Sequence, residues 1–311
     1  MIVVAGGTGF IGNAITLELA GRGQEVCVLS HRAKQGPING GSGIALRRAD
    51  VQDRESLLHA LAGADAVVGA VQFAGFPNEN RRKGLTFDQV DRRGTENLVA
   101  AALQNGVKRY LYISGAGAAA DAAQPWFRAK WGAETAVRAS GMQYAIIRPS
   151  WVYGLRDNAL NQYVKFVKGP LPLVPVIGNG RQRLQPVFVE DVARAVADLL
   201  LSPRSIGDTL EIGGPDVLSM DEVVQTVETV CGRRKRLVHA PVSLMKLLFS
   251  PKALFPALPI PLSPSGLEFA TMDATANNGP LLAALPGFRL TSLSEGLATY
   301  LPSNLSCSGA L

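Results

Sequence analysis

The stretch MIVVAGGTGFIGNA, residues 1–14, decides the fold of this chain. Its apolar run Ile2–Ala5 has no polar interruption, which is typical of a parallel strand buried on both faces. Beyond that run the apolar residues follow helical spacing, and the change of period falls on Gly6, Gly9 and Gly12. The stretch therefore predicts a strand, a tight turn and the N-terminus of a helix.

Each glycine of this turn has a physical role. Gly6 permits the sharp turn, Gly9 lets the backbone approach a phosphate, and Gly12 lets the helix pack close to its strand. Free amides and the helix dipole at such a helix start favour an anion. The G-x-x-G-x-x-G spacing is one residue longer than the usual dinucleotide fingerprint, but its place between a strand and a helix favours dinucleotide binding over a purely structural turn.

The composition is that of a globular protein. The 311 residues are 47% hydrophobic and only 18% charged, which is enough apolar material for a sizeable core. No apolar run approaches the length of a membrane span, and the first predicted strand begins at residue 2, so we expect no leader and a cytoplasmic location. The three cysteines Cys27, Cys231 and Cys307 lie far apart, which fits reduced thiols.

The net charge of +6 invites a nucleic-acid interpretation, but the basic residues occur in small scattered groups without interleaved aromatics. A solvated or partner-facing surface is the favoured interpretation, an anionic cofactor or lipid headgroup is the next, and nucleic acid is the least favoured. His31, His59 and His239 show no metal-ligand spacing, so we expect no metal. The neighbouring acids Glu190 and Asp191 stand at a predicted helix start, where they favour the helix dipole.

Alternating strands and helices organise the first half of the chain. After the opening strand we expect strands at residues 25–29, 44–48, 65–71, 107–114 and 142–148, and helices at 54–61, 86–105 and 129–140. This alternation predicts an α/β fold with a doubly wound parallel sheet, a Rossmann domain over residues 1–150.

The second half has a looser pattern. Residues 151–302 predict a smaller C-terminal cap domain of the kind that selects a substrate, although segments around 185–201 are expected to return to the Rossmann core. Residues 242–262 are strongly apolar, and we expect either buried cap core or an exposed partner or membrane-surface patch. Residues 303–311 are expected to form a disordered tail.

The end of the second predicted strand bears on the choice of cofactor. In a dinucleotide fold an acid at this point holds the adenosine ribose hydroxyls, whereas an arginine accommodates a 2′-phosphate. The sequence supplies Ser30, His31 and Arg32 and no acid, so we expect NADP(H), with NAD(H) less favoured. Asp50 and Val51 are expected at a strand end near the adenine.

Five motifs occur in a fixed order along the chain. They are GGTGFIG at 6–12, DRRGTENLVAAA at 91–102, KRYLYIS at 108–114, IIRPSWVYG at 146–154 and QPVFVEDVARA at 185–195. With these motifs the chain resembles the extended short-chain dehydrogenases/reductases, the NAD-dependent epimerase/dehydratase-like superfamily. The resemblance covers nearly everything up to about residue 230.

The resemblance implies a dinucleotide that lies across the C-terminal ends of the parallel strands, with its nicotinamide near Ser114 and Pro149. The residues expected to bind the cofactor are Gly6, Thr8, Gly9, Phe10, Ile11, Gly12, Ser30, Arg32, Asp50, Val51, Ala70, Val71, Ile113, Ser114, Lys130, Pro149 and Val152.

The resemblance also implies a catalytic tyrosine four residues before a lysine, and a serine or threonine after the fifth strand. In that chemistry the lysine holds the nicotinamide ribose and lowers the tyrosine pKa, and the tyrosine exchanges a proton with substrate. Lys130 is present, but Trp126 stands at the tyrosine position and Ala116 at the hydroxyl position. An indole N–H only donates a hydrogen bond, so the family's acid/base pair is missing while its lysine is kept.

Two residues remain as weak replacement candidates for catalysis, Ser114 and Tyr153, each of which also has a purely structural interpretation. A kept lysine with a lost tyrosine resembles an atypical branch of the superfamily. That branch contains the nucleotide-binding accessory subunit of mitochondrial complex I and its bacterial relatives, together with quinone-oxidoreductase-like and photosystem-assembly proteins.

We therefore expect an NADP(H)-binding accessory or assembly protein with a structurally held cofactor, peripheral at a membrane-associated respiratory or photosynthetic complex. The alternative is an active NADP-dependent reductase or epimerase that acts on a small metabolite or a quinone. A third hypothesis, a redox-sensing regulator, has no sequence feature of its own here.

Overall fold

The computed structural model describes residues 1–31, 44–202, 207–243, 245 and 264–301. Four features singled out in the sequence lie outside the described residues: Arg32, the glycine-rich loop at 34–43, nearly all of the apolar segment at 242–262, and the tail at 303–311.

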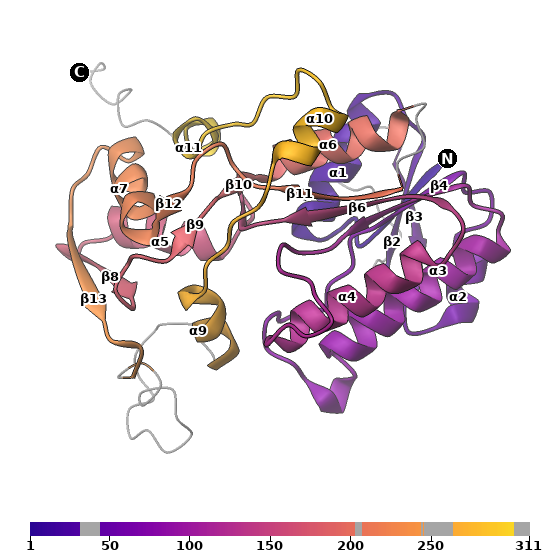
Figure 1. The fold of residues 1–311 in the computed structure, drawn as a ribbon, viewed down its shortest axis with the longest axis horizontal. Helices are drawn as coiled ribbons and strands as arrows, with labels where there is room; N and C mark the ends of the chain where they lie inside the picture. Colours follow the sequence, from indigo (N-terminus) through magenta and orange to yellow (C-terminus); the bar gives the residue numbers. More distant parts are fainter. Residues whose placement is uncertain (32–43, 203–206, 244, 246–263, 302–311) are drawn as a thin grey trace, which may run out of the picture. The chain divides into compact units, whose positions relative to one another are not determined.

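The chain forms two compact units (Figure 1). The first unit combines Met1–Pro149, Val189–Ile212 and Ala276–Arg289, and the second combines Ser150–Phe188, Gly213–Thr275 and Leu290–Leu311. The chain thus leaves the first unit after residue 149 and returns to it twice.

A sheet of seven parallel strands forms the centre of the first unit, in the order β11-β6-β5-β4-β1-β2-β3. Its strands are β1 (Ile2–Ala5), β2 (Val26–Ser30), β3 (Ile44–Arg48), β4 (Ala66–Gly69), β5 (Arg109–Ile113), β6 (Gln143–Pro149) and β11 (Asp208–Ile212). Because β1 has β2 on one side and β4 on the other, the direction of winding reverses between β1 and β4. Ligands of such sheets bind outside the C-terminal strand ends at this point.

Helices cover both faces of this sheet. They are α1 (Phe10–Gly21), α2 (Arg54–Ala60), α3 (Gly94–Gln104), α4 (Pro125–Arg138), α6 (Val189–Leu201) and the short α10 (Gly279–Ala284). Figure 1 shows α1 beside α6 on one face and α2, α3 and α4 on the other. All four residues of β1 are buried, as a strand with helices on both sides requires. The predicted doubly wound parallel sheet is confirmed.

Several predicted boundaries differ from the structure. The helix expected at 86–105 begins as a π-helical segment, Phe87–Arg93, and becomes α-helical only at Gly94. Helix α4 begins at Pro125, four residues before the predicted start. Proline suits a first helical position because its fixed φ matches the helix and no amide is needed there. This earlier start places Trp126 inside α4.

The second unit is built from short strands and helices. They are β7 (Val152–Tyr153), α5 (Ala159–Lys168), β8 (Leu173–Ile177), β9 (Arg183–Leu184), β10 (Val187–Phe188), β12 (Leu218–Ser219), α7 (Met220–Val230), β13 (Arg236–Ala240), α9 (Pro264–Thr271) and α11 (Leu293–Tyr300). Its strands pair two by two, as β10-β7, β12-β9 and β13-β8. Helices α7 and α11 each begin with a capping box, in which a serine and a glutamate satisfy the first amides reciprocally.

Candidate functional site

The glycine turn after β1 is shaped by two close backbone approaches. Gly6 has φ +82°, and a Cβ on it would lie 2.4 Å from the carbonyl oxygen of Ala70, just after β4. A Cβ on Gly12, in the first turn of α1, would lie 2.2 Å from the carbonyl oxygen of Gly6. Any larger residue at Gly6 or Gly12 would push the turn away from the strand ends.

The start of α1 is open to an anion. Thr8 and Gly9 are exposed, and Gly9 is the N-cap of α1 without a side-chain cap. The first turn of α1 carries no acidic residue, so nothing there competes for the helix dipole. Thr8 Oγ1 donates to Ser30 Oγ at the end of β2, with 3.4 Å between the two oxygens. Phe10 and Ile11 follow the turn and are partly buried.

Two further predicted cofactor residues, Asp50 and Val51, follow β3. The Asp50 carboxylate accepts a hydrogen bond from the Gln52 amide at 2.9 Å, and its backbone amide donates to Ser56 Oγ. A Cβ on Gly94 would lie 2.7 Å from Val51 Cγ2, so Val51 packs closely against the start of α3. Hydrogen bonds and packing thus hold the turn after β3 in place at the C-terminal end of the strand.

The remaining strand ends of the first unit bring more of the predicted residues to the same edge of the sheet. Ala70 and Val71 follow β4, Ile113 ends β5 and Pro149 ends β6. The Pro149 carbonyl accepts a hydrogen bond from the Ala116 amide at 2.9 Å. Val152 instead belongs to β7 in the second unit, where it pairs with Val187 of β10.

Lys130 is fixed by a buried carboxylate that the sequence analysis did not single out. Its Nζ lies 3.2 Å from Asp91 Oδ1 and donates to the Ile113 carbonyl at 3.3 Å. The Asp91 side chain is fully buried, and that of Lys130 is 4% exposed. Burial raises the pKa of the Asp91 carboxyl, while Lys130 opposes the rise. Burial alone would lower the pKa of Lys130, but Tyr112 and Asp91 together raise it. Lys130 therefore keeps its proton.

Aromatic rings cover this pair. The Trp126 ring centroid lies 5.7 Å from Lys130 Nζ and 5.4 Å from the ring centroid of Phe76. A Cβ on Gly115 would lie 2.6 Å from the Trp126 ring, so the indole is seated against the loop after β5. Trp126 packs against an apolar cluster whose buried members are Phe73, Phe87, Val90 and Ala129. The space beside Lys130 is thus filled by apolar rings.

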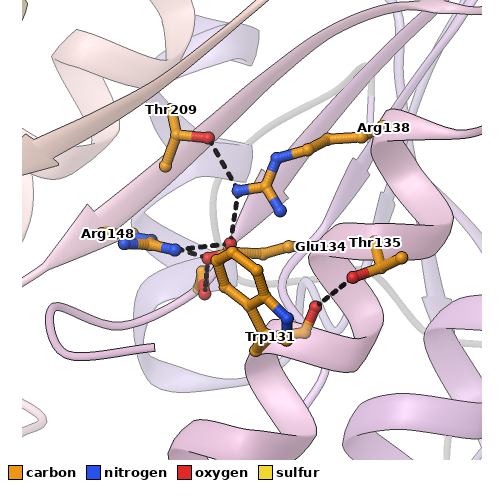
Figure 2. Close-up of polar contacts among 7 residues, drawn as sticks. Trp131, Glu134, Thr135, Arg138, Arg148 and Thr209 are labelled. Carbon is orange, nitrogen blue, oxygen red and sulfur yellow. Dashed lines mark hydrogen bonds and ion pairs between the residues drawn. The ribbon is translucent and has the colours of Figure 1, made fainter. Parts of the chain in front are cut away.

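Ser114 is committed to a second buried carboxylate, that of Glu134 in α4. Its hydroxyl donates to Glu134 Oε1 at 2.6 Å. Figure 2 shows Arg138 and Arg148 meeting the same carboxylate, at 2.6 and 2.7 Å. Glu134 is fully buried, and its hydrogen bonds raise the pKa of the Arg148 guanidinium. The network joins β5, α4 and β6 by charge-assisted hydrogen bonds.

Arg138 extends this network to the edge strand, because its Nη2 also donates to Thr209 Oγ1 of β11 at 3.0 Å (Figure 2). The Trp131 ring lies beneath the arginines, 5.0 Å from Arg138 Cζ and 5.8 Å from Arg148 Cζ. The Ser114 hydroxyl, which donates to Glu134 within this network, therefore has its proton directed at the Glu134 carboxylate.

The second replacement candidate, Tyr153, is a core residue of the second unit. Its side chain is fully buried, and its hydroxyl donates to the Ser292 carbonyl at 3.1 Å. A Cβ on Gly296 would lie 2.1 Å from the hydroxyl, so the start of α11 is shaped around this ring.

Asp91 and Glu134 are the buried partners of Lys130 and Ser114 that the sequence did not indicate. Asp91 opens the motif at 91–102 and Glu134 lies four residues after Lys130, but neither spacing reveals a partner. The available signal was the placement of both acids on mainly apolar helix faces, since an acid on a buried face needs a cation.

Within the described residues, no three histidine, cysteine, aspartate or glutamate side chains gather as a metal site. Among the helices that the structure describes, none combines the length and apolar character needed to cross a bilayer. The thiols of Cys27 and Cys231 are both buried.

Comparison with known proteins gives a consistent result. Residues 2–213 match the sequence profile of the NAD dependent epimerase/dehydratase family. The chain is 30% identical over 256 residues to NADH dehydrogenase [ubiquinone] 1 alpha subcomplex subunit 9, mitochondrial, of Arabidopsis thaliana, a match that covers 80% of this chain and 62% of that protein. It is 24% identical over 248 residues to Photosystem II assembly factor Ycf39 of Trieres chinensis, covering 79% of this chain and 74% of that protein.

The chain spans about three fifths of the length of the NADH dehydrogenase relatives it matches, 62% of the Arabidopsis protein and 63% of the Neurospora crassa 40 kDa subunit. Among solved structures, the Thermus thermophilus UDP-glucose 4-epimerase in complex with NAD superposes with a TM-score of 0.74 at 23% identity. That match covers 96% of each chain, and at this identity it establishes the fold alone.

Proposed function

Because the chain belongs to the NAD dependent epimerase/dehydratase family, we propose that its first unit holds a nicotinamide dinucleotide without turning it over. In this proposal the chain serves as an accessory or assembly subunit. The single observation that carries the proposal is the buried pair of Lys130 and Asp91, with their Nζ and Oδ1 atoms 3.2 Å apart beneath Trp126. The lysine of the family's chemistry is here paired with a carboxylate of its own unit.

The glycine turn supports the binding half of the proposal. Gly6 and Gly12 leave the cradle that a Cβ would fill, and the uncapped start of α1 offers amides and a positive dipole end to a pyrophosphate. A bound nicotinamide dinucleotide would supply hydride chemistry, while Thr8, Gly9 and Ser30 would hold its phosphates and ribose. The residues at the ends of β4, β5 and β6 would line the remainder of the site.

Three placements support the absence of catalysis. Trp126 and Ala116 stand where the family's tyrosine and hydroxyl residue are expected, and neither side chain can exchange a proton at neutral pH. The Ser114 hydroxyl donates to Glu134. The Tyr153 hydroxyl is buried against Ser292 in the second unit.

The choice of NADP(H) over NAD(H) rests on the sequence. Ser30 ends β2 and is followed by His31 and Arg32, so a basic residue stands where NAD-binding members carry an acid. Arg32→Glu should reverse the preference, because a carboxylate binds ribose hydroxyls and repels a 2′-phosphate. Titration of the purified protein with NADPH and NADH measures both affinities. Tighter NADH binding by the unmodified protein would contradict this assignment.

The partner is proposed from the relatives. A mitochondrial NADH dehydrogenase subunit and a photosystem II assembly factor both match more than three quarters of this chain. We propose that this chain likewise associates with a membrane-bound electron-transfer complex, with the held dinucleotide stabilising its fold. Affinity purification of the tagged protein from its own cells, followed by mass spectrometry, identifies the complex.

The central experiment separates a held cofactor from a turned-over one. The purified full-length protein is denatured, and the released nucleotide is identified by chromatography; we expect NADP(H) in roughly equimolar amount, consistent with a tightly held ligand. The intact protein is then mixed with a panel of carbonyls, nucleotide sugars and quinones while NADPH fluorescence is followed. We expect no oxidation above that of free NADPH.

The active-enzyme alternative makes the opposite prediction. A reductase or epimerase would oxidise NADPH or interconvert a substrate from the panel, and Tyr153→Phe would abolish that turnover if Tyr153 were the acid. Turnover with this sensitivity would overturn the accessory assignment while leaving nucleotide binding intact.

A further inference from the structure

The second unit carries an exposed surface in which basic and aliphatic side chains alternate. Its members are Lys168, Leu171, Leu173, Arg234, Arg236 and Val238, all of them exposed. We call this set the basic-aliphatic patch. Leu171, Leu173 and Val238 are 60%, 36% and 41% exposed, respectively.

The patch is contiguous because two chain segments far apart in sequence are fastened together. The turn between α7 and β13 lies against the end of α5: Arg233 Nη1 donates to the Lys168 carbonyl at 2.8 Å. Lys235 Nζ donates to the Gly169 carbonyl at 2.9 Å and to the Leu171 carbonyl at 2.6 Å. These bonds place the basic turn directly beside Leu171.

The pairing of β8 with β13 continues the patch. In their parallel register Leu173 lies opposite Arg236, and Pro175 lies opposite Val238. Alternate residues of a strand share a face, so Leu173, Arg236 and Val238 lie on one face of this two-stranded sheet. Val174 and Val176 of β8 alternate with Leu173 and Pro175, so they point to the other face, where both are fully buried.

The acids of α7 contact groups other than the arginines of the patch. Glu228, near the end of α7, is buried, and its Oε1 accepts a hydrogen bond from the Lys235 amide. The other acids of α7, Asp221 and Glu222, stand at its opposite end, where they contact His239 and Ser219. Arg234 and Arg236 are both exposed, and Arg236 lies opposite the exposed Leu173 in the strand register.

We infer that the basic-aliphatic patch docks on an anionic phospholipid bilayer. Basic side chains attract acidic headgroups, and adjacent leucine and valine side chains enter the boundary between headgroups and acyl chains. A nucleic acid is less suited, because the patch has no aromatic side chain on which a base would stack. The inference goes beyond the proposed function and does not depend on cofactor binding.

The test uses the full-length protein and flotation of vesicles. One set of vesicles contains phosphatidylcholine only, and the other contains about one third phosphatidylglycerol, a physiological range of negative surface charge. We expect binding to the anionic vesicles, weakened by salt, and little binding to the neutral ones. Arg234→Ala combined with Arg236→Ala should lower the partition coefficient about 25-fold, at about fivefold for each charge.

A second variant and a control make the result specific. Leu171→Ser should lower the partition coefficient about tenfold at unchanged charge, because an apolar side chain no longer enters the interface. Arg81→Ala combined with Arg82→Ala removes the same charge from an exposed segment of the first unit and should leave binding nearly unchanged. All substituted positions are exposed, and circular dichroism checks that each variant is folded.

Three outcomes would overturn the inference. These are absence of binding to anionic vesicles, equal binding to neutral vesicles, and an equal loss of binding in the first-unit control. Vesicle binding that survives both patch variants, while binding to a polyuridine probe is lost, would assign the patch to nucleic acid instead.

Discussion

The turn from Gly6 to Gly12 and the first turns of α4 belong to the same unit, but they relate differently to the chemistry of the family. The glycine turn has the close backbone approaches of Gly6 to Ala70 and of Gly12 to Gly6, and the proposed function assigns the dinucleotide to it. Helix α4 keeps Lys130, but Trp126 of the same helix lies over it and Asp91 of the segment Phe87–Arg93 pairs with it. Binding and catalysis therefore rest on separate elements, and one can change while the other remains.

Binding and catalysis can separate because they depend on different groups, the first on the backbone and the second on a side chain. Anion binding at the glycine turn uses backbone amides and the dipole of α1, which depend on backbone shape rather than on side-chain identity. Proton transfer depends on a tyrosine hydroxyl with a lowered pKa, and one substitution removes it.

The largest effect is expected at the buried pair that joins Lys130 of α4 to Asp91 of the π-helical segment Phe87–Arg93. Asp91→Asn should lower the free energy of unfolding by about 3 to 5 kcal/mol, because it leaves the Lys130 ammonium buried without its counter-charge. Lys130→Met should cost a similar amount, and the double variant should recover a large part of the loss. Denaturant unfolding of all four proteins measures the coupling.

The control for this cycle is an exposed pair close by. Asp88 and Arg92 contact each other at 2.5 Å, but the Asp88 side chain is 50% exposed, so Asp88→Asn should cost less than about 1 kcal/mol. Strictly additive costs for Asp91→Asn and Lys130→Met would show that the two residues do not stabilise each other.

The second effect is expected at the glycine turn. Gly12→Ala should weaken nucleotide binding about 100-fold, equivalent to about 2.7 kcal/mol, because its Cβ would force the Gly6 carbonyl out of place. Gly21→Ala is the matched control at the end of α1, where a Cβ meets no atom within 4 Å, and it should leave binding unchanged. Isothermal titration with NADPH measures both. Equal affinities would remove the glycine turn from the site.

A third, smaller effect distinguishes a structural Ser114 from a catalytic one. Ser114→Ala should lower the free energy of unfolding by about 1.5 kcal/mol, because the Glu134 carboxylate loses one donor but keeps Arg138 and Arg148. Thr135→Ala, at an exposed position of α4 next to Glu134, should have little effect on the free energy of unfolding. Nucleotide retained after purification should be the same in both variants. A loss of retained nucleotide with unchanged stability would place Ser114 in the binding site instead.

The sequence predicted the sheet because strand and helix periods are local. The buried run at Ile2–Ala5, the alternation that follows and the glycine turn were sufficient for a doubly wound parallel sheet, and the structure confirms it. The boundaries of α4 and the π-helical start at Phe87–Arg93 were not predicted, because hydrophobic spacing alone does not define a first helical turn. Pro125 was the available signal for the start of α4.

The partners of the site residues were less predictable, because they depend on contacts between distant segments. Asp91 and Lys130 are 39 residues apart, and Ser114 and Glu134 are 20 apart, so no periodicity links them. Positions 116 and 126 reveal in the sequence that two family residues are missing. The contact of the retained lysine with Asp91 is visible only in the structure, and it is the stronger evidence for the proposed function.

The smallest effect is expected when the missing tyrosine is restored. Trp126→Tyr should cost about 1 kcal/mol through lost packing against Phe76, and Trp126→Phe should cost a similar amount without adding a hydroxyl. Neither variant should oxidise NADPH with the substrate panel, because Lys130 remains paired with Asp91 and so lowers the pKa of a new tyrosine little. Adding Asp91→Asn to Trp126→Tyr removes the carboxylate that competes with the new tyrosine for Lys130, and any regained turnover should appear only in this combination. Turnover by Trp126→Tyr without a change at Asp91 would mean that the absence of the tyrosine alone accounts for the lack of activity. Asp91 would then contribute to stability only.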